Sequence, residues 1–461
     1  MISPNYISYK DPTARVIQKD GLYYRLITYN YKTEYDHLMQ SGLYDQLSQK
    51  GIIISHTEIP NDLVTDNNKA QHSLYKTLLP DQITFQSYPF EWSYSQWRKA
   101  IITFLQINLI SLKFGMVLKD ATPFNFYIKE GKAVLLDTSS FSFFKDGDKW
   151  NAYNQFCQMF FGPIVLMHYY GQKWSRIMRV NLRGLPLPFV SKILPLKSWF
   201  NINVLLHLHL HGKYSNKNSS SAKQSQGFSI AKLESMIDIL LSTIQKWDKP
   251  FRFENHWASY YDKEIESKNY LAHKEVVLNQ WLDKLKPKSV LDLGANTGKF
   301  SIIAEKYCKK VIAIESDDLC VDILDTFIEK EKKSIYPLVM DLVESTSNIG
   351  ALNKEYESIY ARAKSELVAA LALIHHLYFN NQLSFSLIGE MLSMLSSKYL
   401  IVEFIPKTDN KVALLMNGKI IDSNDYTIEN FIDTISTRYK INEQIALNDS
   451  ERTLFLLEKL N

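Results

Sequence analysis

The sequence predicts an α/β protein of two folded parts, the second built on a mostly parallel sheet. From residue 288 onward, apolar runs of strand length alternate with helical stretches, which indicates a parallel sheet covered on both faces. A polar stretch rich in Ser, Asn and Lys has almost nothing to bury and marks a linker. A chain of 461 residues also exceeds what one core usually organises. We therefore divide the chain into 1–212, the linker 213–229, a helical lead-in 230–287 and a domain at 288–461.

The bulk composition is that of an ordinary globular protein. The net charge of +4, from 53 basic and 49 acidic residues, gives no support to a nucleic-acid-binding field over the whole molecule. Three cysteines lack metal-site spacing and make a disulfide framework unexpected, which favours a reducing compartment. The start has no apolar signal-peptide region, and the longest apolar runs are too short to span a bilayer. We expect a cytoplasmic protein with no membrane span.

The first part is expected to contain a long buried helix, a strand, a loop and a hairpin, in that order. The helix is "YSQWRKAIITFLQINLISLKFG", and the hairpin "NFYIKEGKAVLLD" follows the loop "LKDATPFNF". The loop contains Asp120 and Asn125, and Asp137 ends the hairpin. In phosphoryl transfer one carboxylate orients the acceptor hydroxyl, while an Asn and a second Asp hold Mg²⁺. This spacing predicts an α+β domain with a phosphotransferase-type site.

This order of elements resembles the large lobe of protein kinases and aminoglycoside-type phosphotransferases. The resemblance implies that Asp120 orients the acceptor hydroxyl and that Asn125 and Asp137 bind Mg²⁺. It departs from the family at Leu118, where a His is usual, and in "DTSS", where no Gly follows the Asp. No Gly-rich loop or convincing strand Lys precedes residue 100, and Arg25 is either a phosphate-facing cation or a surface Arg. We expect a degenerate kinase-like domain, with Mg-ATP binding as the alternative.

A glycine-rich turn follows the first strand of the C-terminal domain. "VLDLGANTGKF" places Asp292 in the strand and a turn from Gly294 to Gly298 before a helix. Glycines let the backbone approach a ligand, Asn296 tolerates a left-handed backbone, and the helix N-terminus offers free N–H groups. Glu315 ends the next strand about twenty residues past the turn, where a carboxylate can accept both hydroxyls of a ribose. The turn and this acid together predict a nucleotide-type cofactor.

A third acid and two final strands complete the pattern. Asp341 ends the strand-like "IYPLVMDL" at the carboxyl edge, where ligands of open α/β sheets bind. "YKINEQIAL" and "RTLFLLEKL" predict a terminal hairpin at the sheet edge. These features resemble the Rossmann-like class I S-adenosylmethionine-dependent methyltransferases, whose last strand runs antiparallel. A nicotinamide-binding Rossmann domain shares the turn and the ribose acid, but the third acid and the hairpin favour the methyltransferase.

The resemblance implies a set of cofactor-binding residues. In that family the turn holds the methionine end of the cofactor, the second-strand acid holds the ribose, and the third-strand acid meets the adenine amine. The residues carried over for S-adenosyl-L-methionine are Asp292, Gly294, Ala295, Asn296, Gly298, Glu315 and Asp341. The middle glycine of the family's turn is an Asn here, which is a mild departure.

Candidate bases lie after the fourth and fifth strands. Methyl transfer from a sulfonium is an in-line displacement, and the attacking oxygen or nitrogen must also lose a proton. "ALALIHHLYF" puts His375 and His376 at the carboxyl edge, where at least one should face the pocket while the other packs as a satisfied core imidazole. Glu403 is a second candidate, or else a surface or capping carboxylate. The Asn/Asp-Pro-Pro-aromatic signature of amino methyltransferases is absent, so adenine and glutamine-amide acceptors are not expected.

Two further clusters have a structural and a functional interpretation. "LHLHLHG" puts His207, His209 and His211 on one face if the segment is a strand, and alternate His residues can bind a metal. No further ligand cluster is nearby, so packing is favoured and no metal is expected. The aromatic cluster "NHWASYYDKE" either lines the acceptor pocket or docks the domains.

Nearly the whole chain resembles a bacterial family of long methyltransferases, some of them labelled nodulation-protein-like. The stretches that carry this resemblance include "SYPFEWSYSQ", "LKDATPFNF", "WNAYNQFCQMFFGPIVLM" and "VEFIPKTD". It leaves the acceptor undefined, and an oxygen or nitrogen of a small molecule or saccharide is favoured. The expected function is methyl transfer. A bifunctional kinase-methyltransferase and a cofactor-binding scaffold without catalysis are the alternatives.

Overall fold

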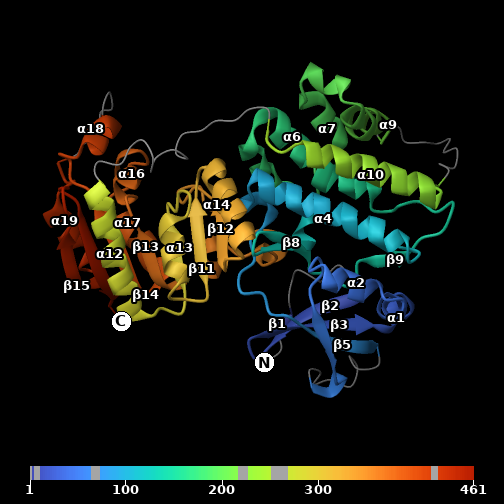
Figure 1. Ribbon diagram of the computed structural model, residues 1–461, viewed down its shortest axis with the longest axis horizontal. Helices are drawn as coiled ribbons and strands as arrows, with labels where there is room; N and C mark the ends of the chain where they lie inside the picture. The colour runs from blue at the N-terminus through green and yellow to red at the C-terminus, as the bar shows by residue number, and fades with distance from the viewer. Residues whose placement is uncertain are drawn as a thin grey trace. The chain divides into compact units, whose positions relative to one another are not determined.

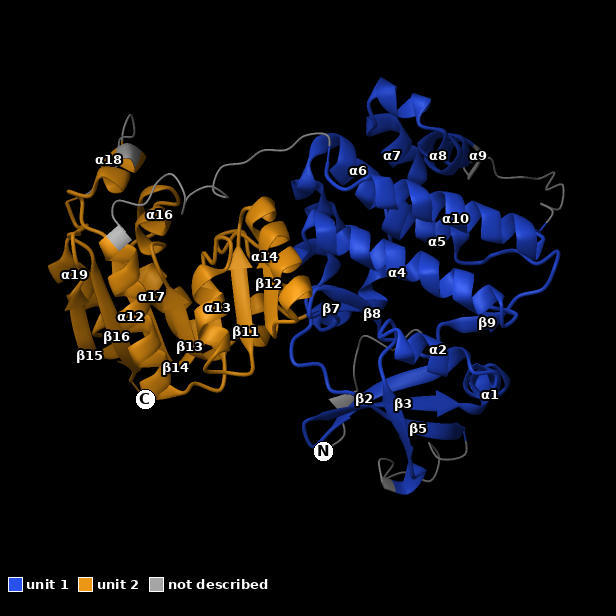
Figure 2. Ribbon diagram, viewed as in Figure 1, with its two compact units in different colours: residues 1–254, 349–356 blue, residues 255–348, 357–461 orange. Residues whose placement is uncertain are grey.

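The chain folds into two units, each described here by itself. Unit 1 comprises residues 1–254 with 349–356, and unit 2 comprises 255–348 with 357–461 (Figure 2). Among the described residues, no helix combines the length and the apolar character needed to cross a bilayer. The computed structural model describes residues 3–4, 11–63, 73–215, 227–250, 268–416 and 424–460. The aromatic cluster around Trp257 lies outside these residues, so its two interpretations stay open.

Unit 1 begins with a five-stranded antiparallel sheet that no sequence pattern predicted (Figure 1). The helices α1 (Lys32–Gln40) and α2 (Leu43–Gln49) follow β3 and precede β4. The strand order is β1 (Ser3–Pro4), β2 (Ala14–Lys19), β3 (Leu22–Thr28), β5 (Leu74–Pro80) and β4 (His56–Ile59). Few side chains of these strands are fully buried, which is why their hydrophobic pattern is weak in the sequence.

The helix, strand and hairpin expected in the first part are confirmed. They are α4 (Tyr94–Leu112), β6 (Met116–Leu118), β7 (Phe126–Lys129) and β8 (Lys132–Leu135). A capping box starts α4, where Ser93 and Gln96 satisfy each other's backbone N–H groups. The hairpin turn uses left-handed backbone at Glu130 and Gly131, with φ of 49° and 73°. A further strand, β9 (Phe141–Phe143), pairs with β6.

The rest of unit 1 is helical around a large aromatic core that includes Trp97, Phe104 and Phe160. Its helices are α5 (Tyr153–Phe156), α6 (Gly162–Tyr170), α7 (Leu187–Ile193), the 3₁₀ helix η8 (Leu196–Phe200), α8 (Ile202–Val204), the π-helix η9 (Leu205–Leu210), α9 (His211–Ser215) and α10 (Ile230–Lys246). Two expectations are corrected here. The segment "LHLHLHG" is helical, not a strand. The helix α10 packs on α4 in the core of unit 1, so it is not part of a lead-in to the C-terminal domain.

Unit 2 contains a seven-stranded sheet, and each strand overlaps an apolar run predicted from the sequence, although the strand Ser396–Phe404 begins three residues before its run "YLIVEFI". The sheet order is β12 (Ile335–Val339), β11 (Val311–Glu315), β10 (Val290–Leu293), β13 (Ser365–Ala370), β14 (Ser396–Phe404), β16 (Thr453–Lys459) and β15 (Tyr439–Ala446). The strands from β12 to β14 run parallel, and β16 is antiparallel to both of its neighbours. Of the two strands in the final hairpin, β15 therefore lies at an edge of the sheet and β16 lies inside it.

Helices cover both faces of this sheet, as the continuous apolar strands predicted. One face packs against α12 (Lys268–Leu285), α13 (Lys299–Glu305) and α14 (Asp318–Glu331). The other meets an aromatic cluster that joins α17 (Phe385–Leu395) and α19 (Ile428–Ile435) to Phe404 and Phe455. Short helices α15 (Ile359–Arg362), α16 (Ile374–Phe379) and α18 (Asn410–Met416) complete the unit. The strand ends are thus held rigidly at the carboxyl edge.

Candidate functional site

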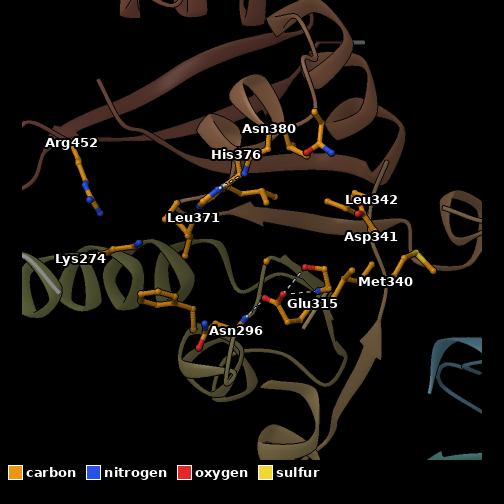
Figure 3. A pocket seen from close by; sticks show the side chains of 18 of the residues that line it. Lys274, Asn296, Glu315, Met340, Asp341, Leu342, Leu371, His376, Asn380 and Arg452 are labelled. Carbon is orange, nitrogen blue, oxygen red and sulfur yellow. Dashed lines mark hydrogen bonds between the residues drawn. The ribbon is translucent and has the colours of Figure 1, made fainter. Parts of the chain in front are cut away.

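A pocket of about 340 Å³ lies at the carboxyl edge of the unit 2 sheet (Figure 3). The connections after β10, β11, β12 and β13 contribute to its wall, as do α12 and the turn between β15 and β16. Its polar and glycine residues include Gly294, Asn296, Glu315, Asp341, His376, Tyr270, Lys274 and Arg452. The pocket therefore lies at the sheet edge predicted from the strand pattern, and four of the seven predicted cofactor-binding residues line it.

The glycine-rich turn adopts the left-handed backbone that its residues predicted. The φ angles of Gly294, Asn296 and Gly298 are 70°, 50° and 84°. The backbone N–H groups of Gly294 and Ala295 both donate to the carbonyl of Ile314, which fixes the turn on β11. A Cβ atom at Gly298 would clash with Leu324 of α14, so this glycine permits close packing. Ala295 and Gly298 are not among the residues that line the pocket.

The carboxylate of Glu315 holds the turn and faces the pocket. Its Oε2 accepts the N–H of Asn296 at 2.8 Å, and its Oε1 accepts the N–H groups of Ser316 and Asp317 at 2.6 and 3.0 Å (Figure 3). Backbone donors on both oxygens fix the orientation of the group. The Ser316 hydroxyl also donates to Oε1, at 3.1 Å. The carboxylate is thus fixed at the wall of the pocket, with three donors on Oε1 and one on Oε2.

Asp341 lines the same pocket but lies beyond its strand. The strand β12 ends at Val339, two residues earlier than the sequence pattern suggested. The Asp341 Oδ1 accepts the N–H of Val343 at 3.0 Å, which fixes the side chain in the loop. A carboxylate held by its own loop two residues on is an Asx-type turn. The acid is therefore at the carboxyl edge, as predicted, on a loop that its own side chain stabilises.

Asp292 lies below the turn rather than in the pocket. The side chain is buried and accepts a hydrogen bond from Ser301 Oγ of α13 at 2.6 Å. Burial raises its pKa to about 6, and the charge of Glu315 adds to this, whereas Ser301 and Lys274 oppose it. Asp292 therefore joins the strand to the helix that follows the turn.

The raised pKa of Asp292 predicts a pH-dependent stability. The folded protein binds this proton more tightly than the unfolded chain, so the stabilisation is complete below about pH 4 and is lost as the pH rises to about 6. We expect Asp292→Asn to stabilise unit 2 relative to wild type, increasingly from pH 4 to 6 and by a constant amount above. Melting temperatures of both proteins across this range test it. A pH-independent difference would contradict the prediction.

The two histidines lie on α16, not at the end of their strand, because β13 ends at Ala370. His376 lines the pocket, and its Nδ1 lies 3.2 Å from the side-chain nitrogen of Asn380. His375 is buried, with its ring centroid 4.2 Å from that of His376. Burial and the neighbouring imidazole lower the pKa of His375 well below its usual value. One histidine faces the pocket and one packs inside, as expected, but the buried Nδ1 has no hydrogen-bond partner among the described residues.

Glu403 belongs to a buried ionic network beside the pocket. Its carboxylate forms an ion pair with Lys274 at 2.6 Å and accepts the hydroxyl of Tyr270. Arg452 donates to the Tyr270 hydroxyl at 3.1 Å and pairs with Asp409 at 2.7 Å. Burial raises the pKa of Glu403, but Lys274 and Arg452 outweigh it and leave the pKa below its usual value. The interpretation of Glu403 as a surface or capping carboxylate is wrong, since its side chain is fully buried.

Sequence reasoning missed three residues of this network that line the pocket: Tyr270, Lys274 and Arg452. The signal for Lys274 was present. It lies on α12 at helical spacing between Tyr270 and Trp281, so a lysine sits in the middle of an apolar stripe. A charged residue in such a position is buried only with a partner. No comparable local pattern marked Arg452, whose partners are far away in sequence.

The predicted phosphotransferase residues meet in unit 1. Asp137 is paired with Arg25 at 2.5 Å and accepts the N–H of Ser139 at 2.9 Å and Ser140 Oγ at 2.7 Å. The side-chain amide of Asn125 lies 3.4 Å from Ser140 Oγ. Burial and the charge of Asp137 raise the pKa of Asp120. Arg25 is therefore not a surface Arg: it binds a carboxylate of its own chain.

The three histidines of "LHLHLHG" pack within unit 1. His207 lies 2.7 Å from the Tyr153 hydroxyl, and His211 stacks on the same tyrosine with ring centroids 5.0 Å apart. His209 lies 2.8 Å from Ser191 through one ring nitrogen and 2.8 Å from Ser198 through the other. No group of His, Cys, Asp or Glu that could hold a metal ion occurs in the part of the chain that the structure describes. The packing interpretation therefore fits these contacts.

Comparisons with known proteins add the following likenesses. No protein-family model matches the sequence. Nodulation protein NoeA of Rhizobium meliloti (strain 1021) is 25% identical over 462 residues, which cover 98% of this chain and 95% of that protein. This relative confirms a likeness to a nodulation protein over almost the full length.

Among solved structures, N-methyltransferase NodS from Bradyrhizobium japonicum WM9 in complex with S-adenosyl-L-homocysteine is 11% identical, with a TM-score of 0.33 over 45% of this chain and 100% of that chain. Magnesium protoporphyrin IX methyltransferase from Synechocystis PCC 6803 is 14% identical, with a TM-score of 0.31 over 44% of this chain and 91% of that chain.

Proposed function

We propose that this protein is an S-adenosylmethionine-dependent methyltransferase that acts on an oxygen or nitrogen of a small molecule or saccharide. The observation that carries the proposal is the pocket in which Gly294, Asn296, Glu315 and Asp341 meet at the carboxyl edge of a sheet with one antiparallel strand. Glu315 would accept both ribose hydroxyls, and Asp341 would accept the adenine amine. When bound, S-adenosylmethionine supplies a methyl group activated on a sulfonium.

The charges around the pocket fit a cofactor with a carboxylate at one end. Figure 3 shows Lys274 and Arg452 at the side of the pocket away from Asp341 and Met340. We assign the carboxylate of the methionyl group to this side of the pocket, where Lys274 also pairs with Glu403 and Arg452 also pairs with Asp409. Gly294 leaves room on the turn between the two ends, because it has no side chain. A volume of about 340 Å³ lies within the usual range for sites of this kind.

His376 is the residue that we assign to the acceptor's proton. The Asn380 side-chain nitrogen lies 3.2 Å from Nδ1. The role as base requires the opposite orientation of this amide, with its oxygen accepting from Nδ1–H, so that neutral His376 keeps Nε2 as an acceptor. The attacking atom would release its proton to Nε2 as its bond to the methyl carbon forms, and S-adenosylhomocysteine would leave with the electron pair of the broken carbon–sulfur bond. The positioning of the two reactants accounts for the remaining acceleration. Glu403 does not line the pocket and would support its wall by holding Lys274 in place.

Replacing His376 is expected to reduce methyl transfer without loss of cofactor binding. We expect His376→Ala to lower kcat by about 10²–10⁴-fold, as for removal of a general base. The acidic limb of the pH profile should disappear with it. Transfer of a labelled methyl group to acceptors in cell extracts measures kcat. Calorimetry measures the binding of S-adenosylmethionine. A variant with full activity and an unchanged pH profile would exclude His376 as the base.

Calorimetry with S-adenosylmethionine tests the proposal itself, and absence of binding to the intact protein would overturn it. Mass spectrometry of extracts incubated with labelled methyl donor, with and without the protein, would identify the acceptor. The scaffold alternative makes a different prediction at Gly294, whose Cβ would lie 3.3 Å from Leu373. If Gly294→Arg abolishes a measurable methyl transfer, the protein is a catalyst and not a scaffold.

For unit 1 we propose a degenerate kinase-like fold that presents the acceptor, with a bifunctional kinase-methyltransferase as the alternative. Asp137 pairs with Arg25 and contacts two serines. This supports a fold that has lost phosphotransferase activity, because Mg²⁺ would have to displace the Arg25 guanidinium from Asp137. We expect no Mg-ATP binding by wild type in calorimetry. Binding that disappears in Asp137→Ala would favour the bifunctional alternative, and Lys330→Ala, on an exposed helix end, is the control.

A further inference from the structure

Unit 1 carries an apolar patch that projects from α7, η8, α8 and η9. Leu196 and Phe200 are 84% and 92% exposed, far beyond what is usual for side chains of this size. The apolar patch consists of Phe189, Leu196, Trp199, Phe200, Ile202 and Leu206. These residues come from four consecutive elements that pack on one another. In Figure 1, α7 lies at the end of unit 1 opposite to the sheet of β2, β3 and β5.

The apolar patch stands on a firmly packed base. Between its exposed residues, Val190, Val204 and Leu208 are buried in the core of unit 1. Trp199, still 45% exposed, stacks on the ring of His209 with centroids 4.1 Å apart. His209 is in turn held by hydrogen-bond contacts to Ser191 and Ser198. The ring of Trp199 is therefore held in place by the fold.

The charge of this region has one sign. From Lys149 to Leu233 the sequence contains no Asp or Glu. The described basic residues of the same stretch include Lys173, Arg183, Lys192, Lys197 and Lys213, all exposed. Lys192 and Lys197 lie within the segment that forms the apolar patch. Exposed Trp, Phe and Leu side chains beside lysines, in a segment that itself contains no acid, are typical of binding to the interface of an anionic bilayer.

We propose that the apolar patch docks unit 1 on the surface of a membrane that carries anionic lipid headgroups. Leu196 and Phe200 would enter the boundary of the acyl chains, Trp199 would lie at the headgroup level, and Lys192 and Lys197 would meet the phosphates. A second copy docked patch to patch would bring these lysines against one another, which disfavours self-association. The proposal does not depend on the methyl transfer proposed for unit 2.

Sedimentation of the full-length chain with lipid vesicles tests the proposal. We expect binding to vesicles of phosphatidylcholine with about 30% phosphatidylglycerol, and at least about tenfold weaker binding to phosphatidylcholine alone. The double variant Leu196→Ser/Phe200→Ser should bind anionic vesicles about tenfold or more weakly than wild type. Lys192→Glu/Lys197→Glu should lose a similar factor and most of the dependence on salt.

Matched variants on unit 2 test whether vesicle binding is specific to the apolar patch. Leu387→Ser/Met394→Ser makes the same kind of change at exposed residues of α17, and Lys306→Glu/Lys309→Glu reverses the same number of charges on unit 2. Both should bind vesicles as wild type does, with melting temperatures within a few degrees. The proposal is overturned if wild type does not bind anionic vesicles, or if both patch variants bind undiminished. It is also overturned if ultracentrifugation shows a dimer that the patch variants abolish while vesicle binding is absent.

Discussion

Replacing Glu315 by Gln is expected to weaken the binding of S-adenosylmethionine by roughly 30- to 1,000-fold. Two hydroxyl donors to a carboxylate contribute about 1.5–3 kcal/mol each, and an amide offers one acceptor oxygen instead of two. The same change disturbs the protein itself, because Asn296, Ser316 and Asp317 donate their N–H groups to the two oxygens of Glu315. Calorimetry of the intact chain measures the dissociation constant.

Two comparisons make the Glu315 experiment specific. Asp341→Asn, at the other predicted contact, should weaken binding by a smaller factor of about tenfold, since one hydrogen bond is involved. Glu329→Gln makes the same chemical change at an exposed position on α14 and should leave binding unchanged. Unaltered binding by Glu315→Gln, in a protein with a normal melting temperature, would show that the ribose contact is assigned wrongly.

Breaking the buried pair between Glu403 and Lys274 is expected to be the most damaging single change to unit 2. Glu403→Ala leaves the ammonium of Lys274 buried without its partner, which costs about 3–5 kcal/mol. The damage should extend to the pocket, because Tyr270 also donates to Glu403. Hydrogen–deuterium exchange of β13 and β14 in the intact chain measures the free energy of opening of this unit.

The pair Lys330–Glu331 provides the matched control, since its side chains are exposed and 3.8 Å apart. Glu331→Ala should change the stability by no more than about 0.5 kcal/mol. The double variant Glu403→Leu/Lys274→Met should recover much of the loss of Glu403→Ala, because it removes both charges together. Equal exchange rates in Glu403→Ala and Glu331→Ala would contradict the importance of the buried pair.

The sheet of unit 2 could be predicted from the sequence because its strands are buried on both faces. Continuous apolar runs such as those of β10 and β11 need no partner to be recognised, and the turn between them is marked by Gly294 and Gly298. The acids at the ends of the strands follow from the same logic. The position of β16 inside the sheet could not be predicted, because strand order depends on pairing between distant segments.

The strands of the first eighty residues were not predicted, because their order depends on distant partners. Arg25 looks like a surface residue within β3, and its meaning appears only with Asp137, which lies 112 positions further on. The alternating Leu and His residues of η9 suggest a strand, since five or six residues of period two cannot be told from a short helical segment. The pattern of α10 was recognised, but it could not show which core would bury it.

The interior position of β16 has a consequence for the order in which the chain folds. During synthesis β15 is completed first, yet the sheet offers it no neighbour except β16, which must insert between β14 and β15. Until β16 inserts, β14 is an unpaired edge of the parallel sheet and β15 has no hydrogen-bonded neighbour. Unpaired strand edges favour incorrect pairing. The gap between β14 and β15 can therefore close only after residues 453–459 have been synthesised.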